Sequence, residues 1–216
     1  TRYRSPIRRA LSTQENWHER LSMSDSWDEY ASDWDANKDA KSYAESAFET
    51  LRDTVNLNRL NILDFGCGTG LLTEKLSPTA NQIVALDSSQ KMIDVLNQKK
   101  LINISTLSTF LSKESIEANQ ILHEKFDLIV ASSVCSFLPN YENTLILLKT
   151  LLTKNGTFVQ WDWLAKEEGV GSGLTNNRVQ SALHSAGFNT INITQPFSLE
   201  SSKGSMDVLM ASAKNA

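Results

Sequence analysis

Cysteine is scarce in this 216-residue sequence, which contains only Cys67 and Cys135. Two cysteines that follow different apolar segments do not form a disulfide framework, so the sequence excludes the small disulfide-stabilised class of protein. Long hydrophobic runs are also absent, because the longest nearly apolar stretch, residues 145–152, is interrupted by Lys149 and Thr150. A membrane-spanning helix needs about 20 apolar residues, so we expect no membrane insertion.

Positive charge and histidine are limited as well. The chain has 21 lysines and arginines against 25 acidic residues, which gives a net charge of −4, and it has only 3 histidines. Without a broad basic face, nucleic acid is a poor candidate partner, and a small molecule is favoured. No group of histidines, cysteines and carboxylates has metal-ligand spacing, so we predict no metal site. The length and the 40% apolar content indicate one globular domain.

Glycine is sparse too, but three of the 9 glycines gather in residues 61–70, where an apolar run ends at an acid and enters a turn. Glycine allows positive φ and a close approach of the backbone to a ligand. The spacing Asp-x-Gly-x-Gly-x-Gly differs from the dinucleotide fingerprint, whose third glycine would fall at Leu71. We therefore expect the turn to hold a ligand that carries a positive group or hydrogen-bond donors, through Asp64, Gly66, Cys67, Gly68 and Gly70.

A second apolar segment, residues 83–86, ends at Asp87, seventeen residues after Gly70. This offset is close to the one of about 20 residues at which an acid accepts hydrogen bonds from ribose hydroxyls. The pattern predicts a nucleoside ligand held by Asp87, with Ser88 beside it. Met92, in the helix expected next, is a candidate for contact with the base, and packing in the core is its alternative.

These motifs resemble those of the class I S-adenosylmethionine-dependent methyltransferases, and the resemblance covers roughly residues 27–213. The glycine turn matches the family's first motif, Asp87 matches its ribose-binding acid, and residues 125–134 match its fourth strand. Residues 154–161 look like its turn into strand five. Within the family the chain is most similar to small bacterial-type enzymes that act on small molecules, because residues 27–31 read Trp-Asp-x-Tyr-Ala.

The resemblance implies a Rossmann-like α/β fold with a doubly wound, mostly parallel seven-stranded sheet of order 3-2-1-4-5-7-6, in which strand seven is antiparallel. It also implies S-adenosylmethionine as cofactor and S-adenosylhomocysteine as product, with Ser132 and Ser133 beside the methionine part. Because methyl transfer from a sulfonium mainly requires positioning, a general base is optional. Asp162, which follows the expected strand five, is the candidate for that catalytic role.

Apolar segments separated by helical patterns predict strands near residues 60–65, 82–87, 102–107, 126–132, 156–163, 188–194 and 206–213. We expect residues 1–26 to form an N-terminal arm, possibly flexible, and residues 27–216 to form the methyltransferase domain. The first fourteen residues contain arginines and no acid. We therefore expect a cytoplasmic protein or, if this arm is a targeting remnant, an organellar one.

Residues 27–55 predict one or two helices that are rich in aromatic side chains. We expect them to lie across the cofactor edge as a lid that orders when cofactor binds, with Tyr30 and Trp34 in contact with it. A permanently docked helix is the alternative. Two functions remain open: a methyltransferase for a small soluble acceptor, acting as a monomer or homodimer, and a non-catalytic domain that binds the cofactor or its product as a sensor.

Overall fold

The computed structural model describes residues 23–169, 173–201 and 204–215. Helices and strands alternate along the chain, and the seven strands form one sheet of order β3-β2-β1-β4-β5-β7-β6. All neighbouring strands pair in parallel except β7, which is antiparallel to both β5 and β6. This confirms the predicted fold class and strand order. The strands are β1 Asn61–Phe65, β2 Gln82–Asp87, β3 Ile104–Ser108, β4 Phe126–Ser132, β5 Leu152–Trp163, β6 Asn189–Ser201 and β7 Gly204–Lys214.

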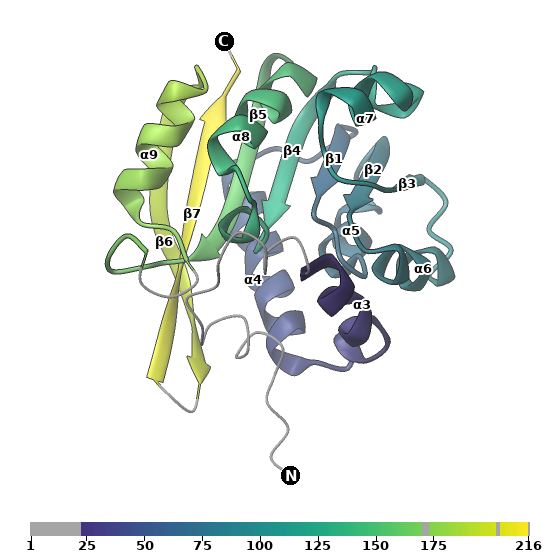
Figure 1. Cartoon of the computed structure of the whole chain (residues 1–216), viewed down its shortest axis with the longest axis horizontal. Coiled ribbons are helices and arrows are strands. Elements are labelled where there is room, and N and C mark those ends of the chain that lie inside the picture. The colour runs from purple at the N-terminus through teal and green to yellow at the C-terminus, as the bar shows by residue number, and fades with distance from the viewer. Residues whose placement is uncertain (1–22, 170–172, 202–203, 216) are drawn as a thin grey trace.

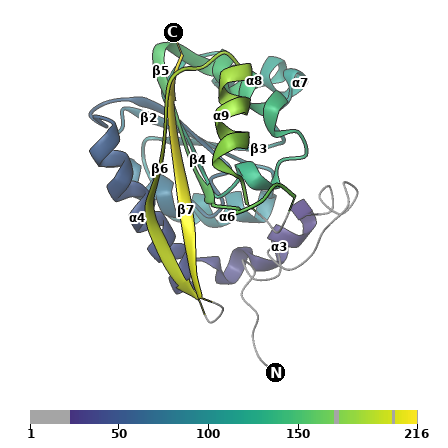
Figure 2. The same cartoon turned by 90° about the vertical axis from the view of Figure 1, so that its left-hand side faces the viewer.

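Helices cover both faces of the sheet (Figures 1 and 2). The described α-helices are α3 Met23–Trp34, α4 Lys38–Thr54, α5 Leu71–Leu76, α6 Gln90–Gln98, α7 Lys113–Ala118, α8 Tyr141–Leu151 and α9 Asn176–Ser185, and the 3-10 turns are η1 Gln120–Leu122 and η2 Cys135–Phe137. Successive residues of β1 explain the double cover. Ile62 packs in the cluster that includes α4 and α5, while Leu63 packs in the cluster that includes α8 and α9. Because side chains alternate across a strand, a continuous apolar run is needed where both faces are buried.

Most strands begin and end close to the predicted residues, but β5 begins at Leu152 rather than at residue 156, and two other differences are informative. β3 begins at Ile104 rather than at residue 102, because Ile102 lies in the preceding turn and is fully exposed. β6 continues to Ser201, beyond the predicted end at residue 194. The pairing of β6 with β7 shifts register between Thr194 and Phe197. A proline between them cannot donate a ladder hydrogen bond, so the sequence pattern breaks there although the strand continues.

The N-terminal segment forms two helices with different surroundings. α4 starts at an Asn37 cap, whose side chain accepts hydrogen bonds from the backbone of Asp39 and Ala40 at 2.9 and 3.3 Å. It packs against the sheet, whereas α3 lies across the edge where the parallel strands end (Figure 1). Helix α3 begins at Met23, four residues before the predicted domain start, and residues 1–22 of the predicted arm lie outside the described residues. Within the described chain, no helix has the length and apolar content to cross a membrane.

Candidate functional site

The glycine turn is hydrogen-bonded to the end of β2. The backbone N–H groups of Gly66 and Cys67 both donate to the carbonyl oxygen of Leu86, at 2.7 and 3.0 Å. Gly66 has a φ of +72°, and a Cβ built on it would lie 2.6 Å from the Cβ of Val134. Gly68 has a φ of +55° and no heavy atom within 4 Å of such a Cβ. The turn therefore needs glycine at residue 66 for packing, while the backbone at residue 68 borders open space.

Gly70 has a different role from the other two glycines. It caps the N-terminus of α5 with a φ of +81°, and a Cβ there would collide with the δ-methyl group of Leu96 in α6. Leu96 is fully buried, so it has little room to move. The third glycine of the motif thus allows α5 and α6 to approach each other, and it does not face the cavity described below.

Asp87 holds the turn in place from the end of β2. Its Oδ2 accepts a hydrogen bond from the N–H of Gly68 at 2.8 Å, and its Oδ1 accepts one from the N–H of Ser89 at 2.8 Å. Burial raises the pKa of this carboxyl above its usual range, and these backbone N–H donors oppose the rise. A carboxylate can accept about four hydrogen bonds, so lone pairs remain for a ligand.

Asp64 is a buried carboxyl at the end of β1, with a side chain only 1% exposed. It accepts a hydrogen bond from the Thr73 hydroxyl at 2.6 Å. Burial is the main cause that raises its pKa to about 7, and the nearby Asp87 carboxylate adds to the rise. No cation pairs with it among the described ion pairs. A positive ligand group would therefore stabilise its ionised form.

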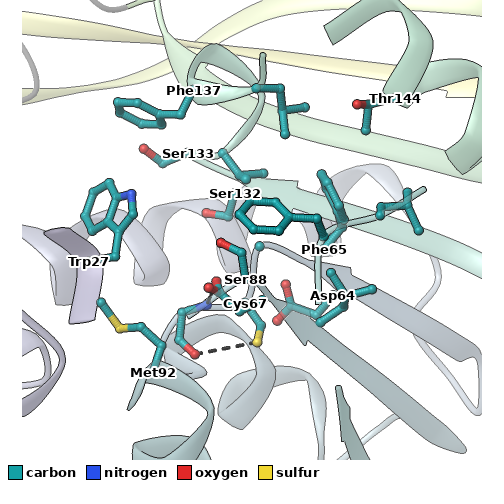
Figure 3. A pocket seen from close by; sticks show the side chains of 18 of the residues that line it. Trp27, Asp64, Phe65, Cys67, Ser88, Met92, Ser132, Ser133, Phe137 and Thr144 are labelled. Carbon is teal, nitrogen blue, oxygen red and sulfur yellow. Dashed lines mark hydrogen bonds between the residues drawn. The ribbon is translucent and has the colours of Figure 1, made fainter. Parts of the chain in front are cut away.

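These groups open into a cavity of about 860 Å³, which is within the usual range of roughly 300 to 1,000 Å³ for small-molecule sites (Figure 3). It lies at the carboxyl edge of the sheet, where ligands of such folds bind. Ten of the predicted site residues line it, namely Trp34, Asp64, Gly66, Cys67, Gly68, Asp87, Ser88, Met92, Ser132 and Ser133. Gly70, Tyr30 and Asp162 are outside its lining.

Ser132 and Ser133 lie where β4 ends and face the cavity (Figure 3). Ser133 has a φ of +56°, an uncommon backbone conformation for a residue other than glycine. Its N–H donates to the carbonyl oxygen of Trp161 at 2.7 Å, which extends the pairing of β4 with β5 by one residue. The family resemblance predicted that these serines lie beside the methionine part of the cofactor, and both line the cavity, while the left-handed turn was not predicted.

Asp162 lies beneath the cavity rather than in its wall. It is completely buried, and it accepts hydrogen bonds from the backbone N–H of Ser136 at 2.9 Å and from the Gln160 amide at 3.0 Å. Burial raises its pKa to about 7. The sequence predicted that this acid follows strand five, but it lies within β5, where every residue from Gly156 to Trp163 is buried. Asp162 therefore needs an intermediary to affect a ligand.

Six aromatic residues that line the cavity were not among the predicted site residues: Trp27, Tyr43, Phe65, Phe110, Phe137 and Trp163. The rings of Trp27 and Trp34 meet edge to face at 5.5 Å, and Trp27 meets Phe137 in the same way at 5.7 Å. Figure 3 shows Trp27 and Phe137 on the same side of the cavity. The seven-residue spacing of Trp27 and Trp34, two helical turns, could have indicated that both face one side of α3. Phe137 carried no such signal.

Side-chain carboxylates attach α3 to the rest of the site. Asp28 accepts a hydrogen bond from the Ser89 hydroxyl, next to Asp87. At the other end of the helix, just beyond Trp34, Asp35 accepts one from the hydroxyl of Thr69 in the glycine turn and forms an ion pair with Lys99 at 2.9 Å. Helix α3, which covers the cavity, is thus attached both to the glycine turn and to the two ends of α6.

Comparison with known proteins agrees with this geometry. A family model described as a methyltransferase domain matches residues 63–158. An uncharacterized methyltransferase of Schizosaccharomyces pombe is 34% identical over 116 residues, which are 48% of this chain and 41% of that protein. The ribosomal RNA small subunit methyltransferase A of Listeria monocytogenes is 31% identical over 107 residues, 47% of this chain and 35% of that protein. The chain thus spans less than half the length of these relatives.

The fold recurs in a solved structure, the complex of DhpI with SAH. That structure has a TM-score of 0.69 and 17% sequence identity, and the match covers 90% of this chain and 95% of that chain. At such an identity the likeness shows the shared fold. The matched methyltransferase domain and the sequence relatives, together with this fold, support the class I S-adenosylmethionine-dependent methyltransferase family for this chain.

Proposed function

We propose that this domain binds S-adenosylmethionine and transfers its methyl group to a small acceptor. The observation that carries the proposal is the junction of Gly68 and Asp87, which are joined by a 2.8 Å hydrogen bond and line the same cavity. The residues fit the cofactor because the space that a Cβ at residue 68 would fill is open for a ligand. The remaining lone pairs of Asp87 suit two adjacent ribose hydroxyls.

Asp64 supports the orientation of the amino-acid part. An amino acid's ammonium group next to this buried carboxylate would supply the missing cation and offset its desolvation. This orientation directs the amino-acid part toward the glycine turn and the end of β4, where Ser132 and Ser133 lie. The base would then extend toward Ser88, Met92 and the segment that follows β3, including Thr109.

When bound, S-adenosylmethionine supplies a methyl group on a positively charged sulfur that a nucleophile can displace. The residues of this chain would hold the two reactants, orient them and exclude water. Trp27, Trp34 and Phe137 form an apolar cover for that purpose. Near-attack positioning can remove about 7 to 11 kcal/mol of a barrier, so the site does not need a dedicated acid or base for a reactive acceptor.

A small acceptor, rather than a nucleic acid, is supported by charge and access. The net charge of −4 offers no basic surface for phosphates. Helix α3 also lies over the carboxyl edge of the sheet, so an acceptor must enter a covered cavity (Figure 1). The resemblance to a ribosomal RNA enzyme makes this proposal worth testing directly.

Calorimetry with S-adenosylhomocysteine tests the cofactor site. Incubation with methyl-labelled S-adenosylmethionine and a fractionated metabolite extract, beside a parallel sample with ribosomal RNA, tests the transfer. We expect binding and a labelled small product. Absence of binding would contradict the cofactor assignment, label in the RNA would contradict the acceptor class, and binding without transfer to any fraction would favour a sensor.

A further inference from the structure

Strand β3 forms one edge of the sheet. Among the described strands it pairs with β2 alone, so its other side has no neighbouring strand (Figure 1). At the two ends of β3 the hydrogen bonds to β2 involve the backbone of Asn103 and of Thr109, each at 2.9 Å. Alternate residues of a strand direct their N–H and C=O groups to alternate sides. The outward backbone groups therefore belong to the residues between these two that have even numbers: Ile104, Thr106 and Ser108.

The sequence along this edge lacks the features that usually keep edge strands from pairing. Residues 101–112 contain no charged residue, no proline and no glycine. Natural edge strands commonly carry charges, prolines or bulges that oppose association. The opposite edge of the sheet, β6, has all three, because it contains Pro196, Glu200 and two register shifts against β7. Of the two edges, β3 is the one without such protection.

Exposed apolar side chains lie at both ends of β3. Three large apolar side chains are exposed in the described part of the chain, and two of them flank this strand. Ile102 is fully exposed, and Phe110 is 56% exposed. They lie four positions before and four positions after Thr106. The apolar residues of this edge are thus placed symmetrically about the central outward residue.

We propose that two copies of this chain associate through β3, antiparallel, with a two-fold axis at Thr106. In this register Thr106 lies opposite the same residue of the second copy, and Ile104 of each copy lies opposite Ser108 of the other. All the outward N–H and C=O groups of β3 can then pair. Ile102 of each copy lies near Phe110 of the other, so both exposed side chains lose contact with water.

This self-complementarity favours a second copy over the strand of another protein. Any extended strand could pair with the backbone of β3, but a two-fold interface needs one surface that matches itself. The spacing of Ile102 and Phe110 about Thr106 provides that match. The uncharged segment also brings no like charges together across the axis.

The interface would extend to the cavity. Phe110 is one of the residues that line it, next to Thr109. Ile102 of the second copy would therefore complete an apolar wall where the segment after β3 borders the cavity. Two strands of five residues bury less than a standard interface, so we expect a dimer that dissociates at about 1 to 100 μM.

Sedimentation velocity over a dilution series tests the association. The comparison is between Ile102→Lys and Ile146→Lys. Ile146 is the third exposed apolar residue, at 47%, but it lies in α8, which leads into β5 in the interior of the sheet. Both substitutions are at exposed positions, so both variants should fold, and melting temperatures check this. Ile102→Lys should raise the dimer dissociation constant at least about tenfold, and Ile146→Lys should leave it within about twofold.

Cross-linking tests the register. Cys67 and Cys135 are buried, so a cysteine added at the edge is the accessible thiol. Opposite residues of a hydrogen-bonded antiparallel pair have Cα atoms about 5.5 Å apart, a distance that a disulfide can span. Thr106→Cys should therefore form a disulfide-linked dimer on mild oxidation. Ser108→Cys, which would face Ile104, should form at least about tenfold less.

Four results would overturn the proposal. A monomer at every concentration would leave the edge to a strand of another protein, and species larger than a dimer would contradict the two-fold pairing. Equal weakening by both lysine substitutions would contradict the position of the interface. Equal cross-linking of both cysteine variants would contradict the register. None of these measurements uses a cofactor, so they decide the dimer independently of the proposed function.

Discussion

Asp87→Asn is the substitution that tests the site most directly, because Asp87 serves both the protein and the expected ligand. Its two carboxylate oxygens accept backbone hydrogen bonds from Gly68 and Ser89, each at 2.8 Å. Asparagine has a single side-chain acceptor oxygen, so one of these bonds must be lost and an NH₂ group must face an N–H donor. The sequence alone predicts a loss of affinity with an intact fold. From the structure we also expect this substitution to loosen the glycine turn, because Asp87 accepts the hydrogen bond from Gly68.

The magnitude follows from these contacts. Loss of one backbone hydrogen bond to a charged acceptor should lower the free energy of unfolding by about 1 to 3 kcal/mol. Loss of the carboxylate toward the ribose should reduce binding energy by about 1.5 to 3 kcal/mol, which weakens S-adenosylhomocysteine affinity about 10- to 150-fold. Isothermal calorimetry measures the affinity, and urea unfolding without ligand measures the stability.

Asp127→Asn is the matched control. Asp127 also accepts a backbone hydrogen bond, from the N–H of Asn61 at 3.0 Å, but it lies at the start of β4, away from the cavity. The control should lose some stability and keep full affinity. If Asp87→Asn binds S-adenosylhomocysteine within twofold of the unmodified protein, Asp87 does not hold the ribose and the cavity has been assigned to the wrong ligand.

Three further predictions follow from the same contacts. Gly68→Ala and Gly70→Ala both place alanine at positive φ, but only residue 68 lines the cavity. Gly68→Ala should therefore lose the ligand-induced rise in melting temperature, while Gly70→Ala should lower the melting temperature and keep that rise. The reverse pattern would refute the assignment. The pKa of Asp64 is about 7 in the folded protein against an ordinary 3.8, so as pH rises the unfolded chain loses this proton at a lower pH than the folded protein does. The free energy of unfolding should therefore fall as pH rises from about 4 to about 7. Asp64→Asn should make that fall shallower, and an unchanged slope of stability against pH in urea titrations would contradict the prediction. Finally, amide exchange over residues 27–34 should slow when S-adenosylhomocysteine binds, and equal protection in both states would exclude a lid.

The strands could be predicted because their signal is local. The run Ile62-Leu63 is continuous because both neighbouring layers need apolar side chains at successive positions, and no tertiary knowledge is required to read it. The order of the strands in the sheet has no such local signal, and its prediction came from the family resemblance. The extension of β6 was missed for a physical reason, since the register shift after Thr194 interrupts the alternating pattern that identifies a strand.

The residues of the site likewise divide into those that local sequence signals predict and those that depend on tertiary packing. Gly68 and Asp87 could be predicted as neighbours at one ligand site because turn geometry and the motif offset are properties of the chain itself, and both line the cavity. Gly70 has the same motif signal, but only the position of Leu96 in α6 shows that it serves helix packing. The burial of Asp162 was beyond sequence reasoning, because it depends on how the segment after β4 packs on β5, where the N–H of Ser136 donates to this carboxylate.

The two N-terminal helices show where the predicted lid can act. The sequence predicted that the helices of residues 27–55 both lie across the cofactor edge, but α4 carries a stripe of small residues, Ala40, Ala44 and Ala47, whose spacing leads to Leu51 and gives it one buried face. Helix α4 is therefore part of the core.

Helix α3 is held mainly through the side chains of Asp28 and Asp35 and through the ring contacts of Trp27 and Trp34. Partly exposed carboxylate contacts contribute little stability each, whereas opening α4 would expose the core. Any ordering on ligand binding must then be confined to α3.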